Sequence, residues 1–258
     1  MAVEPVRGQP SPMEKWLRLL EAFADRDEWG VRELARAVAL PRSVVHRLLH
    51  EMERVGLLSP GSEPGRFSVG PALVRLASVV LDRLDIVRVA RPILEETMRR
   101  CGETVILTLY DPTRRQFFAV DAVESPQAVR YIWDALRQWS HVHIGSSGKG
   151  ILAFLPPEQQ EAILADLPDP VPGLRPVSKE QLRQELAAAR RRGYVVSRSE
   201  RYAGAMGVAA PVYNALGRVV GDVIITAPES RMGARSEEEW GHLVMRAAGA
   251  ISRALGHR

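Results

Sequence analysis

The chain has 258 residues, of which 46% are apolar, 26% charged and 6% aromatic. This composition is typical of a globular protein and excludes a disordered or fibrous one, and the length favours two domains. The longest apolar runs, residues 208–212 and 219–227, are too short to cross a membrane, so no membrane partner is expected. Residues 1–10 lack the apolar stretch of a secretory signal, and the single cysteine, Cys101, excludes an internal disulfide; both observations favour a cytoplasmic protein.

The total charge gives only weak evidence for a nucleic-acid partner. The formal net charge is +4 and the isoelectric point is about 9.6, but residues 1–85 contain twelve basic and twelve acidic residues. Because a neutral domain can still present a basic face, the positions of the charges matter more than their sum.

Three short helices are predicted in the N-terminal part of the chain. Residues 11–14 read Ser-Pro-Met-Glu, a pattern that caps the start of a helix, and apolar residues at helical spacing follow it. Residues 31–38 predict a second helix, residues 39–41 a tight turn, and the following apolar stripe a third helix that ends near Gly56. Two short helices around a tight turn have the geometry of a helix-turn-helix.

The outward face of the third helix carries side chains that can read DNA. Arginine can pair with guanine, serine and histidine can reach base edges or phosphates, and valine can contact a thymine methyl group. Residues 57–59 and 66–70 predict a hairpin that forms a wing, where Arg66 could contact phosphate. The predicted DNA-binding residues are Arg32, Arg42, Ser43, Val44, His46, Arg47 and Arg66.

The same segment resembles a known family. It is similar to the N-terminal domain of the IclR family of bacterial transcriptional regulators in two runs, LARAVALPRSVVHRLLHEMERVGLL and GRFSVGPALVRLA. The resemblance implies a winged helix-turn-helix domain over residues 11–70, preceded by a flexible N-terminus over residues 1–10. Residues 71–85 are helical by pattern and resemble the linker helix of the family.

Beyond Glu103 the pattern changes to short strands with intervening helices, which predicts an α+β domain around an antiparallel sheet. Strands are predicted over residues 105–110, 116–123, 129–133, 194–197, 206–213 and 219–227, and helices over 149–155, 157–167, 178–192 and 236–255. The motifs CGETV, GKGILAFLP, RGY and AAPV resemble the IclR effector domain in order and spacing. This resemblance implies a GAF-like effector-binding domain over residues 86–258.

In that family a small effector, often an organic acid or an aromatic compound, lies between the loop before Gly-Lys and the facing strands. The resemblance therefore implies an effector site formed by Ser146, Ser147, Ser197, Met206, Gly207, Ile224 and Thr226. Where relatives commonly have an acid and a cysteine, this chain has Ser197 and Gly207. Both changes imply a larger cavity that is more receptive to an anion, so the expected effector is an organic or aromatic carboxylate.

A cluster just upstream could complete this site. Arg130 could supply a cation, and Tyr131, Trp133 and Trp139 could supply stacking faces. Of these, Arg130 and Trp133 are predicted to bind the effector. The alternative is that the tryptophans belong to the core and that Arg130 is a surface charge.

Catalytic and metal chemistry are not indicated. Residues 145–150 have neither the spacing of a phosphate-binding loop nor that of a Gly-x-Ser-x-Gly elbow. His141 and His143 alternate on a presumed strand and could supply two metal ligands, but a third ligand is missing. We therefore expect no enzyme activity, no metal and no cofactor.

Together these features predict a DNA-binding transcriptional regulator whose operator binding is modulated by a small-molecule effector. The expected partners are double-stranded operator DNA, the effector and further copies of the chain, as a homodimer or a dimer of dimers, because one recognition helix reads only a short site. Two alternatives remain open at this point: a small-molecule-processing enzyme with a fused DNA-binding head, and an architectural DNA-binding protein that needs no ligand.

Overall fold

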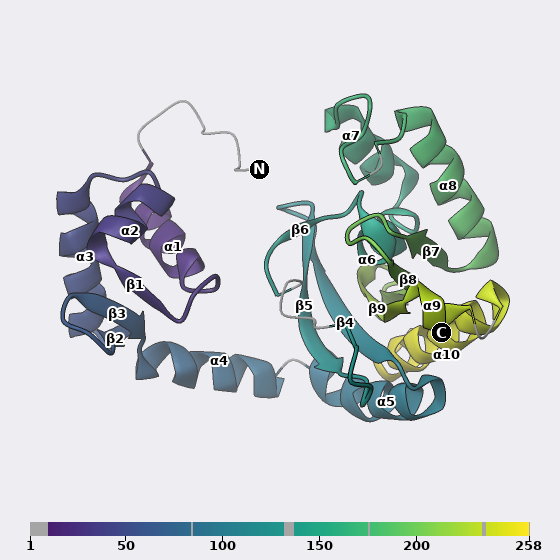
Figure 1. Cartoon of the computed structure of the whole chain (residues 1–258), viewed down its shortest axis with the longest axis horizontal. Coiled ribbons are helices and arrows are strands. Elements are labelled where there is room, and N and C mark those ends of the chain that lie inside the picture. The colour runs from purple at the N-terminus through teal and green to yellow at the C-terminus, as the bar shows by residue number, and fades with distance from the viewer. Residues whose placement is uncertain (1–9, 84, 132–136, 175, 234–235, 258) are drawn as a thin grey trace. The chain divides into compact units, whose positions relative to one another are not determined.

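The computed structural model describes residues 10–83, 85–131, 137–174, 176–233 and 236–257. The chain divides into two compact units, Met1–Arg83 and Leu84–Arg258 (Figure 1). The predicted flexible N-terminus falls almost wholly on residues 1–9, outside the described residues. Among the described residues, no helix is long and apolar enough to cross a membrane.

The N-terminal unit contains four helices and a small antiparallel sheet with the strand order β1-β3-β2 within its described residues. Its elements are α1 (Pro12–Ala22), β1 (Glu28–Gly30), α2 (Val31–Ala37), α3 (Arg42–Arg54), β2 (Leu58–Pro60), β3 (Arg66–Val69) and α4 (Pro71–Arg83). The predicted winged helix-turn-helix is confirmed, with α2 and α3 as its helix pair and β2 and β3 as its wing. The short strand β1 was not predicted, because three residues are too few to show an alternating pattern.

Local features explain how α1 begins and how α3 is placed in the N-terminal unit. Ser11 and Glu14 form a capping box, in which each side chain accepts a hydrogen bond from the other residue's backbone N–H. Ala39 takes a left-handed conformation (φ 53°) in the turn between α2 and α3. The apolar stripe of α3 then packs into the core of the unit, where Leu49 and Met52 are completely buried.

The C-terminal unit is built on one antiparallel sheet with the order β6-β5-β4-β9-β8-β7. The described strands are β4 (Thr104–Asp111), β5 (Gln116–Val123), β6 (Ser140–His141), β7 (Val195–Arg198), β8 (Ala205–Tyr213) and β9 (Val219–Pro228). The helices are α5 (Asp85–Cys101), α6 (Gly145–Leu152), α7 (Pro157–Asp166), α8 (Lys179–Arg192), α9 (Glu229–Met232) and α10 (Glu237–Ala254). The predicted α+β class with an antiparallel sheet is therefore confirmed.

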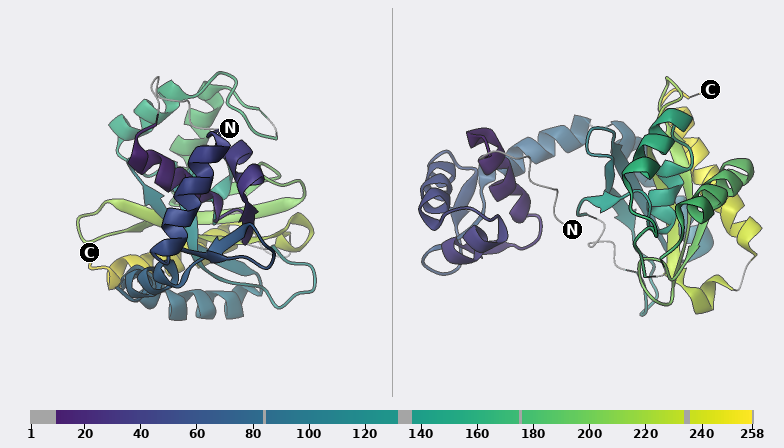
Figure 2. Two further views of the ribbon diagram at one scale, coloured as in Figure 1. Left: turned by 90° about the vertical axis from the view of Figure 1, so that its left-hand side faces the viewer. Right: turned by 90° about the horizontal axis from the view of Figure 1, so that it is seen from above.

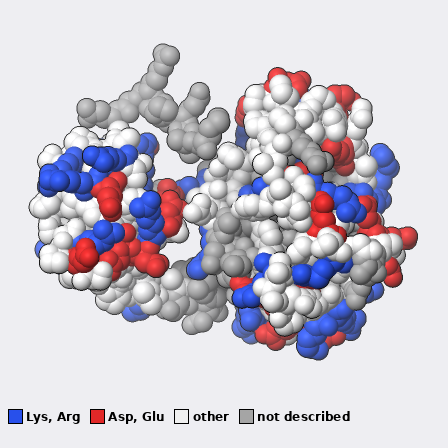
Figure 3. Space-filling model, in the orientation of Figure 1, with Lys and Arg blue, Asp and Glu red and all other residues white. Residues whose placement is uncertain are grey.

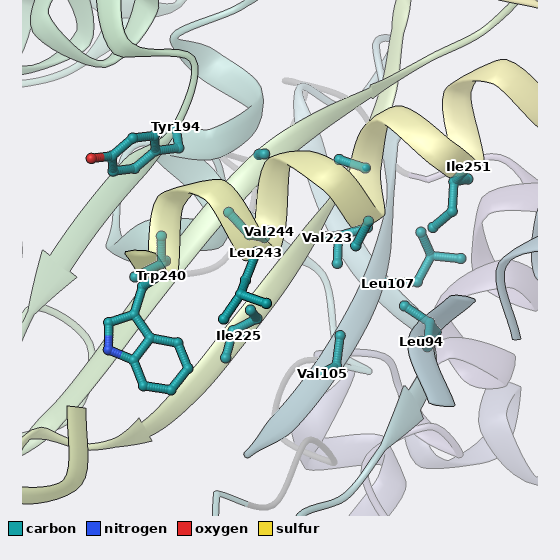
Figure 4. Close-up of a cluster of buried hydrophobic side chains, with 14 of the residues drawn as sticks. Leu94, Val105, Leu107, Tyr194, Val223, Ile225, Trp240, Leu243, Val244 and Ile251 are labelled. Atoms are coloured by element: carbon teal, nitrogen blue, oxygen red, sulfur yellow. The ribbon is translucent and has the colours of Figure 1, made fainter. Parts of the chain in front are cut away.

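Helices cover both faces of this sheet: α5 and α10 lie on one face, and α6, α7 and α8 on the other (Figures 1 and 2). Successive strand residues alternate between the two cores, so that Val223 and Ile225 pack on the α5 and α10 side and Ile224 on the opposite side. Figure 4 shows α10 presenting Trp240 and Val244 toward β4 and β9. This burial on both faces explains why the central strands read as nearly continuous apolar runs.

Three local expectations are wrong. Residues 129–131 form no strand, and the remainder of that predicted strand, residues 132–133, lies outside the described residues. Strand β6 ends at His141, so His143 lies beyond it rather than on the same strand. Helix α6 begins at Gly145 and not at Lys149, because the small residues 145–148 form its buried first turn instead of a loop.

Candidate functional site

The recognition helix α3 presents a polar face to solvent. Arg42, Ser43, His46 and Arg47 are exposed, and Val44 is half-buried beside them. This face exists because Val45, Leu48, Leu49 and Met52 occupy the core positions of the same helix. Figure 3 shows lysine and arginine side chains gathered on the upper part of the N-terminal unit. The polar start of α3 is therefore exposed to solvent, as DNA binding through this helix requires.

The exposed face includes a short histidine cluster. The His46 and His50 rings meet edge to face with their centroids 4.6 Å apart, and His50 Nδ1 lies 3.0 Å from Glu53 Oε2. His46 therefore has a neighbour that restricts its orientation, whereas Arg42 and Arg47 form no ion pair with any described residue. Both arginines are accordingly available to an anion or a base edge.

The two other predicted DNA-binding arginines lie outside α3. Arg32 is exposed on α2. Arg66, on β3, lies between two carboxylates, with its Nε 3.4 Å from Glu28 Oε2 and its Nη2 3.5 Å from Glu33 Oε2. Hydrogen bonds from Ser62 lower the pKa of Glu28, so that carboxylate remains charged beside Arg66. The structure thus gives Arg66 internal partners that a phosphate contact would have to compete with.

A cavity of about 40 Å³ lies in the C-terminal unit, between the first turn of α6 and strands β7, β8 and β9. It is lined by Tyr131, Gly145, Ser146, Ser147, Ser197, Glu200, Arg201, Tyr202, Ala205, Met206, Gly207, Ile224 and Thr226. Sheet register explains the floor, because Ser197 pairs with Gly207 and Gly207 pairs with Thr226 across the three strands. These residues therefore stand side by side on one face of the sheet.

The first turn of α6 approaches this floor closely. A Cβ atom at Gly207 would lie only 2.2 Å from Ser146 Oγ, and one at Gly148 would lie 2.8 Å from the backbone of Val142. Glycine at both positions allows the helix to pack this tightly. The volume that Gly207 opens is thus filled by the Ser146 hydroxyl, whereas the sequence indicated that it would enlarge the cavity.

The wall beside the cavity holds a charge network. Lys149 is almost fully buried, and its Nζ lies 2.6 Å from Glu185 Oε2 and 2.8 Å from Glu200 Oε2. Glu200 also accepts a hydrogen bond from the Gly145 N–H at 3.2 Å. This network fixes the start of α6 to the loop between β7 and β8, so Glu200 serves mainly to position these elements.

Seven of the nine predicted effector-binding residues line this one cavity: Ser146, Ser147, Ser197, Met206, Gly207, Ile224 and Thr226. The Met206 side chain packs in the core on the other side of the sheet, and its carbonyl accepts a hydrogen bond from the Thr226 hydroxyl. Arg130 is exposed and paired with Glu124 at 2.8 Å, away from the cavity. Trp133 lies outside the described residues.

The cavity also contains residues that the sequence did not assign to it, above all Arg201 and Tyr202. Both lie in the loop between β7 and β8, where no periodic pattern distinguishes inward from outward side chains. Tyr131, which the sequence suggested as a stacking face, also lines the cavity, and its ring meets that of Tyr202 with the centroids 5.5 Å apart. The sequence signal for Arg201 was its charge directly after Glu200. That signal was ambiguous, because Arg198 carries the same charge three residues earlier and is exposed.

The histidine pair near β6 has no third potential metal ligand beside it among the described residues. The rings of His141 and His143 are 5.4 Å apart, and burial lowers the pKa of His143 to about 4, with His141, Arg201 and Lys149 lowering it further. No cluster of three or more potential metal-ligating side chains occurs among the described residues.

A winged helix-turn-helix with an exposed polar recognition helix, together with a second domain that contains a cavity, is typical of a transcriptional regulator. Comparisons with known proteins support this class. Residues 13–60 match the IclR helix-turn-helix domain, and residues 78–253 match the C-terminal domain of the bacterial transcriptional regulator IclR. The chain belongs to the IclR family of DNA-binding transcriptional regulators. Because that family consists of regulators, the expectation that the chain is not an enzyme is confirmed.

Individual relatives extend over nearly the whole chain. The chain is 32% identical to the HTH-type transcriptional regulator KipR of Bacillus subtilis, covering 94% of this chain and 96% of that protein. It is 30% identical to the acetate operon repressor of Salmonella typhimurium, covering 98% and 92%. It also resembles the solved structure of an IclR homologue from Microbacterium hydrocarbonoxydans complexed with 4-hydroxybenzoate, with a TM-score of 0.80 at 30% identity, covering 95% of this chain and 99% of that one.

Proposed function

We propose that an organic or aromatic carboxylate binds in the cavity beside α6 and modulates the affinity of this regulator for its operator. The observation that carries the proposal is the meeting of the α6 N-terminal turn, the hydroxyls of Ser146 and Ser147 and the guanidinium of Arg201 in one cavity. The first N–H groups of a helix and its dipole favour an anion. The bound 4-hydroxybenzoate in the Microbacterium relative supports an aromatic acid as one candidate.

The exposed start of α3 is proposed to enter the major groove. Arg42 and Arg47 would contact guanine or phosphate, Ser43 and His46 would reach base edges or phosphates, and Val44 would contact a thymine methyl group. This role is supported by the exposure of the two arginines and by the lack of an ion pair between either of them and a described carboxylate. For Arg32 and Arg66 the proposed role is phosphate contact, which positions the protein without specifying a sequence.

Two or four copies of the chain are proposed to act together. One recognition helix covers only a short site, and two copies on half-sites about 34 Å apart would double the contacts. An operator with two-fold symmetry is the expected consequence. Effector binding would then change the placement of the paired heads, with a coupling of about 1–3 kcal/mol if it is typical of such systems.

The test uses the full-length protein and operator DNA selected by it from a random duplex library. Operator affinity is measured at fixed salt with and without 4-hydroxybenzoate and other carboxylates, and sedimentation gives the number of copies bound. A saturable change in operator affinity with one of the acids supports the proposal. Steep salt dependence without any sequence preference in the selection would instead indicate an architectural DNA-binding protein.

A further inference from the structure

The Arg201 side chain in the C-terminal unit has neutral hydrogen-bond partners, and no described carboxylate forms an ion pair with it. It follows β7 and lines the cavity. Its Nη1 donates to Ser140 Oγ at 3.2 Å and its Nη2 donates to the Ile144 carbonyl at 3.1 Å. Both acceptors are uncharged oxygens, and Arg201 forms no ion pair with any described residue. A guanidinium remains protonated even where burial lowers its pKa, as it does here.

One hydrogen-bond donor of Arg201 has no acceptor. Its Nε atom is buried and makes no hydrogen bond. A buried charged donor without a partner is unfavourable, and most such groups in proteins are satisfied. The guanidinium of Arg201 therefore keeps unused hydrogen-bonding capacity, and the residue lines the cavity.

The two carboxylates nearest in this region do not supply that acceptor. Glu200 is held by Lys149 and by the N–H of Gly145. Asp222 is completely buried beside Thr108, and burial raises the pKa of its carboxyl well above the usual value, which favours the neutral form. Among the described residues, Arg201 therefore forms no ion pair with a carboxylate, although Asp222 lies near enough to act on its charge.

Among the described lining residues, Glu200 is the only carboxylate, and the others are neutral apart from Arg201. Tyr131 and Tyr202 meet edge to face near Arg201, and burial raises the pKa of the Tyr131 hydroxyl, so it stays protonated and can donate a hydrogen bond. Ser146 and Ser147 add two hydroxyls on the opposite side. An anion that enters thus meets the charge of Arg201 and several neutral donors, while the Glu200 carboxylate is held by Lys149 and the Gly145 N–H.

We propose that Arg201 recognises the effector directly, through its guanidinium and a carboxylate oxygen of the acid, and that it makes the cavity selective for monocarboxylic acids over neutral analogues of the same shape. This inference rests on the proposed function, since it assigns the contact by which the acid is held. A charge-assisted hydrogen bond in a buried site is stronger than a neutral one. Replacing the acid by its amide removes the charge while keeping nearly the same size.

The test compares acids with their amides on the full-length protein by calorimetric titration. The probes are acetate, propionate and benzoate, each with its amide, so that the same series also shows which size the cavity accepts. The wild-type protein is expected to bind at least one acid and to bind the matching amide at least about tenfold more weakly. This comparison needs no substitution and so does not depend on a variant that folds.

Substitutions then assign the effect to one residue. Arg201→Met is expected to weaken acid binding by about 10- to 150-fold and to leave amide binding unchanged. Arg201→Lys keeps the charge but not the Nε position and should give an intermediate loss. The matched control is Arg198→Met, because Arg198 lies three residues away on β7, is exposed and pairs with Glu237; it should bind acids like the wild type.

The outcomes separate the two proposals. Wild-type acid affinity in the Arg201→Met protein, or equal binding of acid and amide by the wild type, overturns the role of Arg201 and leaves the acid-responsive regulator standing. If none of the acids binds the wild type, the inference about Arg201 is overturned. If none of the wider set of carboxylates changes operator affinity either, the proposed effector class fails as well.

Discussion

The recognition helix α3 and the cavity beside α6 both contain arginine, but in opposite settings. Arg47 on α3 is exposed and can meet any anion that approaches from solvent. Arg201 is largely enclosed, with two neutral acceptors and one unmet donor. An exposed arginine adds one of the many salt-dependent contacts that give affinity for DNA. An enclosed arginine instead distinguishes between small ligands of different charge. The comparison predicts that substitutions in the two regions have separable effects.

The largest effect is expected at the recognition helix. Arg47→Ala should weaken binding to the selected operator at least about 30-fold, because each lost base contact is worth about 1–3 kcal/mol and two copies lose one each. Acid binding by the C-terminal unit should stay at the wild-type level. Operator affinity is measured by fluorescence anisotropy, and acid affinity by calorimetry.

Arg54→Ala is the matched control for this variant. Arg54 is also exposed, but it lies in the last turn of α3, away from the proposed groove-facing start. It should change operator affinity far less than Arg47→Ala. Equal losses in the two variants would mean that α3 contributes only general electrostatic attraction, and unchanged operator affinity in Arg47→Ala would remove Arg47 from the interface.

A second effect concerns only the stability of the sensing unit. Burial lowers the pKa of His143 to about 4, while the unfolded chain binds the same proton near pH 6.5. The folded-state pKa is the lower one, so stability is greatest above about pH 6.5 and is lost as the pH falls toward 4. The contribution of this group is at most about 3 kcal/mol. Denaturant unfolding at several pH values measures it.

His143→Gln should make the stability of the C-terminal unit less sensitive to acid in that window. His242→Gln is the control, because the His242 side chain is 56% exposed. If the wild type and His143→Gln lose stability in parallel between pH 6.5 and 4, the proton is not excluded from His143 in the folded state.

A third effect tests the close approach of α6 to the sheet. A methyl group at Gly207 would collide with Ser146 Oγ, so Gly207→Ala should force that hydroxyl to rotate toward the cavity. Acid binding should weaken about tenfold, the size expected for mild overpacking. Ser146→Ala removes the colliding atom, and the double variant should therefore recover most of the lost affinity.

Calorimetry measures the affinity of the two single variants and the double variant for the acid that the wild type binds most tightly. Strictly additive effects of the two substitutions would show that Gly207 and Ser146 do not interact across the cavity. An unchanged affinity in Gly207→Ala would place the acid elsewhere in the unit.

The two regions also differ in how far the sequence alone could define them. On α3 the apolar positions Val45, Leu48 and Met52 determine the buried face, so the exposed face with Arg42 and Arg47 follows from helical periodicity. Most strands and helices of the C-terminal unit were also predicted from local patterns, but the strand expected over residues 129–133 was not found over its described part. These are local patterns, and local patterns are what a single sequence contains.

The cavity could not be defined by such patterns, because its walls come from separate segments. Ser146, Ser197 and Thr226 were found only through resemblance to a family, and their grouping reflects the register of β7, β8 and β9. Arg201 was missed because its loop has no periodicity, and its environment depends on Ser140 and Ile144, far away in the sequence. The filling of the Gly207 volume by Ser146 likewise depends on packing between distant elements.

The smallest expected effect uses a feature that the two units share. Ser11 caps α1 and Ser236 caps α10, each within a capping box that includes a glutamate three residues later. Replacing either serine by alanine should destabilise its own helix by about 1 kcal/mol. Hydrogen exchange of the α1 and α10 amides reports on each helix separately. If the units behave as independent folding units, Ser11→Ala should accelerate exchange in the N-terminal unit only, and Ser236→Ala in the C-terminal unit only. Faster exchange in both units after either substitution would show that the stabilities of the N-terminal and C-terminal units are coupled. Substitutions in one unit could then also affect the function of the other.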